Sequence, residues 1–379
     1  MKFEIGQSIP IFFVQEKEQE FIGEKNLRSR EAERCNMAIE KISIENFTVF
    51  EKTELEFTQG INILIGENGT GKTHLMKVLY SACQATKQNV DFGQKLVRVM
   101  LPDDYKIARL VRRKPGNNTA KIKIVGVSNQ KRKSLETQFS IKTKKWDAEI
   151  HGKDGWESEL SDLSGIFIPA KEILSNSYNL NAAVQMNNVK FDDTYLDIIN
   201  SSKIDISAGR NTFDKENKLK MMECITEGKT VYEAKADEFY LKVGNSKQEF
   251  NLVAEGIRKV ALIWQLIKNG ALEKGAVLFW DEPEANLNPV HIPIIVELLL
   301  MLQRNGVQVF VATHDYIMAK YFEVKREKED KIMFFSFDPR EKEKKGICYE
   351  KKEIFGDLKY NAIASSFNTL LDEIYDMGD

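Results

Sequence analysis

Cysteine and histidine are scarce in this sequence of 379 residues, and neither residue type is clustered. The sequence contains Cys35, Cys83, Cys224, Cys348, His74, His151, His291 and His314. A structural zinc site needs ligands at short spacings, and a disulfide framework needs far more cysteine per unit length. We therefore expect neither to be the basis of the fold.

Long apolar runs and a charge of one sign are also missing. No stretch approaches the roughly 18 uncharged apolar residues of a membrane-spanning helix. The N-terminal segment lacks a basic start followed by an apolar run, as a signal peptide would have. Lys and Arg number 55 against 57 Asp and Glu, for a net charge of −2, which disfavours a chain that coats nucleic acid over its whole surface. We expect a cytoplasmic protein with no membrane partner.

Composition changes along the chain predict three parts. Residues 1–38 are rich in Glu, Lys and Arg and predict an N-terminal arm, residues 39–324 predict one large head, and residues 325–379 predict a C-terminal extension. Within the head, alternating segments over about 96–150 predict an antiparallel β lobe. Residues of about 175–250 predict a compact helical insertion. No heptad pattern persists beyond a turn or two, so we expect no long coiled coil.

Buried strands that alternate with helices indicate an α/β fold with a parallel core sheet. The predicted buried strands are Ile61–Ile65, Ile166–Ile168, Ala276–Trp280 and Val307–Ala312. The predicted helices are Lys72–Ala85, Glu255–Asn269, Val290–Gln303 and Ala362–Tyr375. A hairpin is predicted before the first buried strand, and Tyr105–Val111 is predicted as a strand of the β lobe.

A glycine-rich loop lies between the first buried strand and the helix that follows it. Its residues are Gly66, Glu67, Asn68, Gly69, Thr70, Gly71, Lys72 and Thr73, which match the phosphate-binding pattern G-x4-G-K-[ST]. Backbone N–H groups of such a loop surround the β-phosphate of ATP, while Lys72 reaches the β- and γ-phosphates and Thr73 binds Mg²⁺. A chance glycine turn is the alternative, but the place between a strand and a helix favours phosphate binding.

Two acids follow the buried strand at Ala276–Trp280. Asp281 would hold the metal, and Glu282 stands where a general base could activate water. Taken alone, these acids could be an exposed turn after a core strand. Their combination with the phosphate-binding loop favours the catalytic interpretation.

The segments that follow carry a resemblance to a known family. Glu282–Pro289 resembles the D-loop of ABC-type ATPases, and Val309–Asp315 resembles the strand that ends in their switch histidine, here His314. Over residues 38–324 the chain is similar to the soluble ABC-like group that contains RecF, the SMC proteins and the OLD ATPases. The resemblance implies a P-loop ATPase head that works as a head-to-tail dimer or higher homo-oligomer, with His314 sensing the γ-phosphate.

Two family motifs depart from their usual form. The best match to the signature motif is Val253–Lys259, which keeps Gly256 but has no serine. Arg258 or Lys259 could then supply the missing charge to the nucleotide of the other protomer. Likewise, Phe167–Glu172 stands where the glutamine loop is expected but contains no Gln. There Lys171 or Glu172 could reach the nucleotide, although Glu172 could equally be an acid at a helix start.

Basic residues concentrate in the predicted β lobe. Residues 103–145 hold thirteen Lys and Arg against three Asp and Glu. The basic residues are Lys106, Arg109, Arg112, Arg113, Lys114, Lys121, Lys123, Lys131, Arg132, Lys133, Lys142, Lys144 and Lys145. This region, 106–145, could contact nucleic acid or an acidic protein, or it could be an ordinary solvated β surface. Trp146 and Trp156 could stack on bases or cover the core of the lobe.

Together these observations predict an ATP- and Mg²⁺-dependent switch with slow hydrolysis. Only 65 residues follow His314, and they contain no clustered carboxylates on strand ends, so we expect any nuclease or toxin chemistry to come from a separate effector protein. Short heads of this type resemble the stand-alone ATPases of bacterial anti-phage systems of the Septu and PARIS type. A RecF-like DNA-binding repair ATPase is the alternative, and a transporter subunit is a weaker third.

Overall fold

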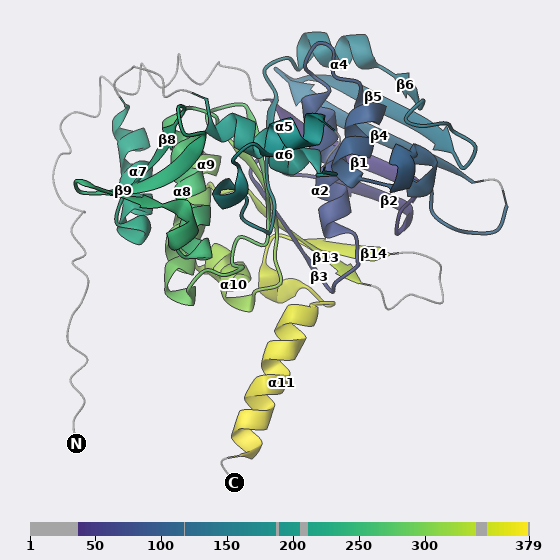
Figure 1. Ribbon diagram of the computed structural model, residues 1–379. Coiled ribbons are helices and arrows are strands. Elements are labelled where there is room, and N and C mark those ends of the chain that lie inside the picture. The colour runs from purple at the N-terminus through teal and green to yellow at the C-terminus, as the bar shows by residue number, and fades with distance from the viewer. Residues whose placement is uncertain (1–36, 117, 187–188, 205–210, 339–346, 378–379) are drawn as a thin grey trace. The chain divides into compact units, whose positions relative to one another are not determined.

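The computed structural model describes the chain in five stretches (Figure 1). These are residues 37–116, 118–186, 189–204, 211–338 and 347–377. The chain divides into two units, Met1–Cys35 and Asn36–Asp379. The predicted arm 1–38 lies almost wholly outside the described residues, so only the second unit is considered below.

A six-stranded sheet forms the core, in the order β14-β13-β3-β12-β11-β7. Its strands are β3 (Ile61–Gly66), β7 (Ser164–Ile168), β11 (Ala276–Asp281), β12 (Gln308–Ala312), β13 (Ile332–Asp338) and β14 (Cys348–Lys352). All neighbours pair in parallel except β14, which is antiparallel to β13. Every residue of β3, β11 and β12 is buried, because a parallel sheet is covered on both faces. The four predicted core strands are confirmed.

The core sheet continues past residue 324, where the sequence suggested that the head ends. Strand β13 pairs with β3 along its length, with Phe337 opposite Gly66. A strand pattern in the sequence does not say which sheet the strand joins. Part of the predicted C-terminal extension therefore belongs to the core of the head.

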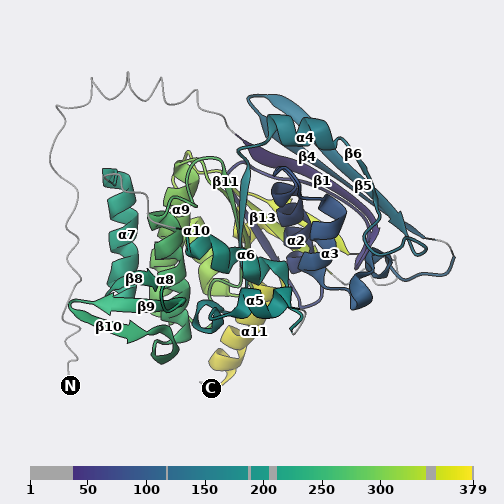
Figure 2. The same ribbon diagram turned by 45° about the horizontal axis from the view of Figure 1, so that its top comes forward.

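Helices cover both faces of this sheet. Figure 2 shows α2 (Lys72–Gln84) on one side and α9 (Ile292–Arg304) with α10 (Tyr316–Lys325) on the other. Helix α8 (Glu255–Lys268) packs against α7, and α11 (Ala362–Asp376) ends the described chain. The longest described helix, α11, has 15 residues, so the described part of the chain has no long coiled coil. Nor does any helix in these stretches combine the length and apolarity that crossing a bilayer requires.

A five-stranded antiparallel sheet forms the predicted β lobe, in the order β2-β1-β4-β5-β6. Its strands are β1 (Ala38–Phe47), β2 (Phe50–Glu56), β4 (Thr119–Ser128), β5 (Lys131–Ser140) and β6 (Glu149–His151). The strand predicted at Tyr105–Val111 is wrong. That stretch forms two 3₁₀ helices, Asp103–Tyr105 and Ile107–Leu110, since Ile107 and Leu110 are buried at a helical spacing of three residues. Helix α3 (Phe92–Met100) precedes them.

The insertion is only partly helical. Helices α5 (Leu180–Gln185), α6 (Asp193–Ser202) and α7 (Phe213–Thr226) are followed by an antiparallel sheet of β8 (Lys229–Glu233), β9 (Glu238–Val243) and β10 (Ser246–Glu249). The helical insertion that the sequence predicted is therefore followed by a small β-sheet that it did not predict. The missed signal is a Gly-Asn pair after alternating Phe239 and Leu241, because Gly244 adopts the positive φ that a two-residue hairpin turn requires.

Candidate nucleotide-binding site

The phosphate-binding loop connects β3 to α2, as predicted. Gly71 has a φ of 94° and caps α2. A Cβ atom at Gly71 would lie 2.6 Å from the side chains of Phe50 and Val49, which are part of the β lobe and the turn before it. Glycine at this position therefore allows the loop to turn tightly against the lobe and to point the first N–H groups of α2 into its centre.

Lys72 lies across the loop that contains it. Its amine donates hydrogen bonds to the carbonyl oxygens of Gly66, at 2.8 Å, and Glu67, at 2.9 Å. Burial lowers the pKa of Lys72 to about 8, although three nearby carboxylates act in the opposite direction. A buried cation held only by carbonyl oxygens is suited to a polyanionic ligand, which would stabilise the charged form.

Thr73 and Asp281 meet at the other end of the loop. The Thr73 hydroxyl donates to Oδ2 of Asp281 at 2.9 Å, and burial raises the pKa of that carboxyl group. Two oxygen ligands next to a phosphate loop fit Mg²⁺, which takes one or two protein ligands and completes its shell with phosphates and water. The residues predicted as metal ligands are therefore brought together.

Glu282 and His314 face each other across neighbouring strand ends. Nε2 of His314 lies 3.8 Å from Oε1 of Glu282, because β11 and β12 pair in parallel and place Asp281 opposite Ala312. Burial and the nearby Lys72 lower the pKa of His314 against the effect of Glu282, which favours the neutral imidazole. Glu282 has a φ of 48°, a strained conformation of the kind found at functional sites.

Glu284 is a site residue that the sequence did not reveal. Its Oε1 accepts hydrogen bonds from the Thr313 hydroxyl at 2.8 Å and from the His314 N–H at 3.0 Å. Glu284 thereby holds the segment before α10 in place and orients His314. Only the parallel pairing of β11 with β12 brings these residues together, so no local sequence pattern could have identified the contact.

The signature-like segment at the start of α8 is packed against the D-loop. A Cβ atom at Gly256 would lie 2.2 Å from the carbonyl oxygen of Asn286. The side chain of Lys259 is buried and donates to the carbonyl oxygen of Ala285 at 2.9 Å. Nε of Arg258 forms an ion pair with Oε2 of Glu172 at 2.8 Å.

These contacts bear on two expectations. The charges of Arg258 and Lys259 are both engaged within the chain, so the structure does not support the hypothesis that either is offered to the nucleotide of a second protomer. Glu172, with a side chain only 1% exposed, binds Arg258 at the start of α8 and accepts hydrogen bonds from the N–H and hydroxyl groups of Ser175 in the short helix Leu174–Asn176, which favours the helix-start alternative. Lys171 is exposed. The segment that departs from the family's signature motif is therefore packed against the D-loop, and its charged side chains are paired within the chain.

Helix α6 brings the insertion to the metal end of the site. Asp192 caps α6 and pairs with Lys77, which lies one turn after Thr73 on α2. Tyr195 lies in the first turn of α6, and its pKa is raised to about 12 by burial and then by the carboxylates of Asp192 and Asp281. Nothing in the polar sequence of the insertion indicated that α6 pairs with α2 in this way.

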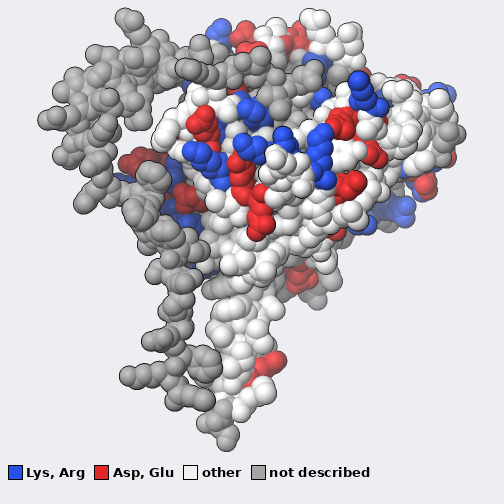
Figure 3. Space-filling view, turned by 60° about the vertical axis from the view of Figure 1, so that its left-hand side comes forward, with Lys and Arg blue, Asp and Glu red and all other residues white. Residues whose placement is uncertain are grey.

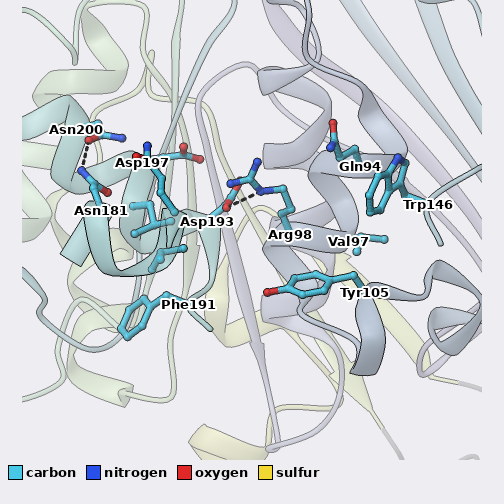
Figure 4. A pocket seen from close by; sticks show the side chains of 13 residues that line it. Gln94, Val97, Arg98, Tyr105, Trp146, Asn181, Phe191, Asp193, Asp197 and Asn200 are labelled. Carbon is cyan, nitrogen blue, oxygen red and sulfur yellow. Dashed lines mark hydrogen bonds and ion pairs between the residues drawn. The ribbon is translucent and has the colours of Figure 1, made fainter. Parts of the chain in front are cut away.

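A second set of acidic residues on α6 borders a cavity of about 460 Å³. Asp193 accepts from Lys95 at 2.7 Å and from Arg98 at 3.1 Å. Figure 4 shows Arg98 and Asp193 meeting between α3 and α6, with Trp146 and Tyr105 on the α3 side. Trp146 thus borders this cavity. Trp156, by contrast, is fully buried, and its indole N–H donates to Ala82, so it belongs to the core of the lobe.

Much of the basic region 106–145 is paired with acids. The ion pairs are Lys106–Asp104, Arg109–Asp103, Lys114–Glu51, Lys123–Glu136, Lys131–Glu159 and Arg132–Glu40. A hollow of about 540 Å³ is lined by four residues of this region, Arg109, Arg112, Arg113 and Lys114. The face of the molecule over the insertion, shown in Figure 3, carries both signs of charge side by side.

The fold matches solved head domains of SMC proteins. The chain superposes on the Smc head bound to the C-winged helix domain of ScpA with a TM-score of 0.55 and 12% identity, over 85% of this chain and 99% of that one. It superposes on the Smc head with an extended coiled coil from Pyrococcus furiosus with a TM-score of 0.53 and 11% identity, over 89% and 100% of the two chains. The predicted fold, an ABC-type ATPase head, is confirmed.

Sequence comparison gives the family. Residues 61–319 match the family described as "AAA domain, putative AbiEii toxin, Type IV TA system", and the chain belongs to this family. Over 62 residues it is 37% identical to the DNA replication and repair protein RecF of Bacillus thuringiensis (strain Al Hakam) and of Bacillus cereus (strain B4264). The match covers 16% of this chain and 16% of each RecF.

Proposed function

We propose that this protein is an ATP-dependent switch that binds ATP with Mg²⁺, closes as a head-to-tail dimer and reopens after slow hydrolysis. One observation carries the proposal. The phosphate loop and the side chains of Asp281, Glu282 and His314 converge at the carboxyl ends of the adjacent strands β3, β12 and β11. Ligands of open α/β sheets bind at this edge.

Each residue has a role in this mechanism. Lys72 and the N–H groups at the start of α2 bind the β- and γ-phosphates. Glu282 accepts the proton of the attacking water, and neutral His314 donates a hydrogen bond to the γ-phosphate. Thr73 and Asp281 would hold Mg²⁺, which would supply positive charge beside the phosphates.

We expect slow turnover because of the signature-like segment at the start of α8. In a head-to-tail dimer the start of α8 would cap the nucleotide of the other protomer. Here Gly256 lies against Asn286, and Arg258 is paired with Glu172. The D-loop and α8 therefore have to rearrange together before α8 can contact a nucleotide.

The test measures assembly and phosphate release in the wild-type protein. Sedimentation with ATP and Mg²⁺, with ADP and Mg²⁺, and without nucleotide should show a dimer or higher oligomer only with ATP. Phosphate release should follow at a low rate and should stop when Mg²⁺ is chelated. A chain that has the same mass in all three conditions would contradict the switch.

We further propose that the switch controls a separate effector, a toxin or nuclease, in anti-phage defence. The resemblance to Septu- and PARIS-type ATPases favours this role, and the description of the matched family, which refers to a type IV toxin–antitoxin system, supports action together with a second component. Either this role or the alternative below is expected in the cytoplasm. Loss of phage protection in cells that carry the Lys72→Ala variant, with the neighbouring genes intact, would support the role, and unchanged protection would oppose it.

DNA repair of the RecF type is the alternative. It is favoured by the local identity to RecF and by the hollow lined by Arg109, Arg112, Arg113 and Lys114. DNA affinity that strengthens with ATP and weakens steeply with salt would favour repair. The variant with Arg112 and Arg113 both changed to Ala should then lose DNA affinity.

A further inference from the structure

The cavity of about 460 Å³ between α3 and α6 is separate from the candidate nucleotide-binding site. Among the described residues, none that lines it belongs to the phosphate loop Gly66–Thr73 or to the D-loop Glu282–Pro289. Its volume lies in the range of roughly 300–1,000 Å³ that is usual for small-molecule sites. The nucleotide switch therefore gives this cavity no role.

Contacts in the protein interior fix the two walls of the cavity. Asp193 of α6 pairs with Lys95 of α3 at 2.7 Å, and Lys95 also pairs with Asp197 at 2.6 Å. Oδ2 of Asp197 accepts a hydrogen bond from the Tyr80 hydroxyl of α2 at 2.5 Å. Helix α6 is therefore held against both α2 and α3. A ligand would enter a cavity that is already formed, which lowers the cost of ordering a site on binding.

The charges at the cavity wall compensate one another. Asp193 and Asp197 share the ammonium of Lys95, and Nε of Arg98 lies 3.1 Å from Oδ1 of Asp193. Two carboxylates are thus matched by two cations. Because a charge is costly to bury without a partner of its own, this wall suits an uncharged group.

Aromatic rings stand on opposite sides of the cavity. Figure 4 shows Trp146 and Tyr105 on the α3 side and Phe191 on the side of α6. The backbone of Trp146 approaches α3 closely because Gly93 has no side chain, and a Cβ atom there would lie 2.8 Å from the Trp146 carbonyl oxygen. All three aromatic residues are half-buried, so each retains surface on which a flat ring can stack.

Amide side chains supply hydrogen-bonding groups. Those that line the cavity are Gln94, Asn181, Gln185 and Asn200. Nδ2 of Asn181 donates to Oδ1 of Asn200 at 2.6 Å, and this bond uses only part of the hydrogen-bonding capacity of the two amides. An amide presents a donor and an acceptor in one plane, which is how Asn and Gln recognise the edge of a nucleobase.

A lysine amine lies next to each of the two rings on the α3 side. Nζ of Lys145 is 5.7 Å from the ring centroid of Trp146, and Nζ of Lys190 is 5.6 Å from that of Tyr105. Both lysines are exposed. A sugar or the aromatic side chain of a protein would use the rings and the amides but not the amines. A nucleotide uses all three, since its base stacks while its phosphate binds positive charge.

We propose that this cavity binds a nucleobase, which stacks on Trp146 and Tyr105 and is recognised by the amides of α5 and α6, with its phosphate near Lys145 or Lys190. The base belongs to a free nucleotide or to an unpaired position of a nucleic acid strand, and the chemistry of recognition is the same for both. The inference goes beyond the nucleotide switch and does not rest on it.

The first experiment measures binding to the full chain by calorimetry. One arm compares the 5′-monophosphates of the common ribonucleosides with ribose 5-phosphate, which has no base. The other arm compares single-stranded DNA and RNA oligonucleotides with an abasic strand of the same length. Preference for a monophosphate over ribose 5-phosphate would identify a free nucleotide as the ligand, and preference confined to the oligonucleotides would identify a strand. No preference for the base in either arm would overturn the proposal.

The second experiment locates the site with the preferred probe. Trp146→Ala should weaken binding about 5- to 150-fold, as expected for the loss of one base–aromatic stack. Asn200→Ala, which changes an exposed residue of α6, should weaken it about 2- to 12-fold through one lost hydrogen bond. Phe213→Ala removes an aromatic ring that is 79% exposed on α7 and, as the control, should bind normally.

Wild-type affinity in Trp146→Ala would refute the cavity as the site. Circular dichroism shows whether that variant is folded. If it is not, Asn200→Ala decides, and wild-type affinity in Asn200→Ala would then refute the cavity.

Failure of this proposal can be separated from failure of the switch. Lys72→Ala should bind the preferred probe as the wild type does, and Trp146→Ala should still assemble with ATP and Mg²⁺ in sedimentation experiments. Loss of probe binding in Lys72→Ala would show that the base enters with a nucleotide at the phosphate loop, which would overturn the cavity site. A wild-type chain that binds the probe but does not assemble with ATP would contradict the switch alone.

Discussion

The candidate site has two halves, the phosphate loop with α2 and the signature-like segment with α8. Each half contains a buried lysine near the start of its helix. Lys72 begins α2 and donates to the carbonyl oxygens of its own glycine loop. Lys259 lies in the first turn of α8 and donates to the carbonyl oxygen of Ala285 in the D-loop. Burial lowers the pKa of both amines.

The surroundings of the two helix starts differ. A Cβ atom at Gly69 in the phosphate loop would meet nothing within 4 Å, whereas one at Gly256 would collide with Asn286. The phosphate loop is therefore open at Gly69, although Gly71 at the start of α2 is packed against Val49 and Phe50, whereas Gly256 at the start of α8 is packed against the D-loop. The phosphate loop therefore has the geometry of a ligand site, while the start of α8 is held in a contact that has to be exchanged for any contact with a nucleotide.

The largest expected effect comes from removing the charge of Lys72 at the start of α2. Lys72→Ala should weaken ATP binding by at least about 100-fold, because the phosphates lose their charged hydrogen-bond donor. Titration with a fluorescent ATP analogue would measure it. Lys52→Ala, which changes a lysine 77% exposed, is the control and should bind ATP normally. Normal binding by Lys72→Ala would remove the loop from the site.

The next effect separates binding from chemistry. Glu282→Gln should bind ATP as well as the wild type does but hydrolyse it about 100- to 1,000-fold more slowly, because the water loses its general base. The ATP-bound assembly should then persist in sedimentation experiments. If phosphate release is unaffected, Glu282 is not the base and the His314 contact needs another explanation.

A smaller effect is expected from a larger side chain at Gly256, at the start of α8. Gly256→Ala should force α8 and the D-loop apart and cost about 1–3 kcal/mol of stability, measured by urea unfolding. ATP binding at the phosphate loop should survive, while ATP-dependent assembly should fall. Gly356→Ala is the matched control, since its Cβ would meet nothing within 4 Å. Equal stability of the two variants would show that the Gly256 contact is not tight.

The smallest effect concerns Lys259. Lys259→Met keeps the apolar stem but leaves the Ala285 carbonyl oxygen without this donor, so we expect a loss of about 1 kcal/mol at pH 7. Because burial makes the native pKa of Lys259 lower than its ordinary value of 10.5, the native state holds this proton less tightly than the unfolded chain does. The burial penalty is complete below the native pKa and disappears as the pH rises through that pKa toward 10.5.

The difference in unfolding free energy between wild type and Lys259→Met should therefore grow over that alkaline range, and chemical denaturation at several pH values would measure it. A difference that is constant from pH 7 to 10 would mean that the amine is solvated in the native state.

The sequence predicted the phosphate loop and the acidic pair because each of these motifs is local. Gly66–Thr73 and Asp281–Glu282 each lie within a few residues at the end of an apolar strand, and strand ends of a parallel sheet meet at one edge. Glu284 and Arg258 could not be assigned in this way. Their partners are 29 and 86 residues away in the sequence, and only packing brings them together.

The sequence by itself determined that this chain has a parallel core sheet, a phosphate-binding loop and a general-base candidate, because periodicity and short motifs depend on neighbouring residues. The tertiary structure decided three further points. It placed β13 next to the phosphate loop, closed the start of α8 against the D-loop, and formed a cavity between α3 and α6. Each of these points depends on which surfaces meet. A pattern of apolar side chains indicates that a surface has to be covered, but it does not indicate which other surface covers it.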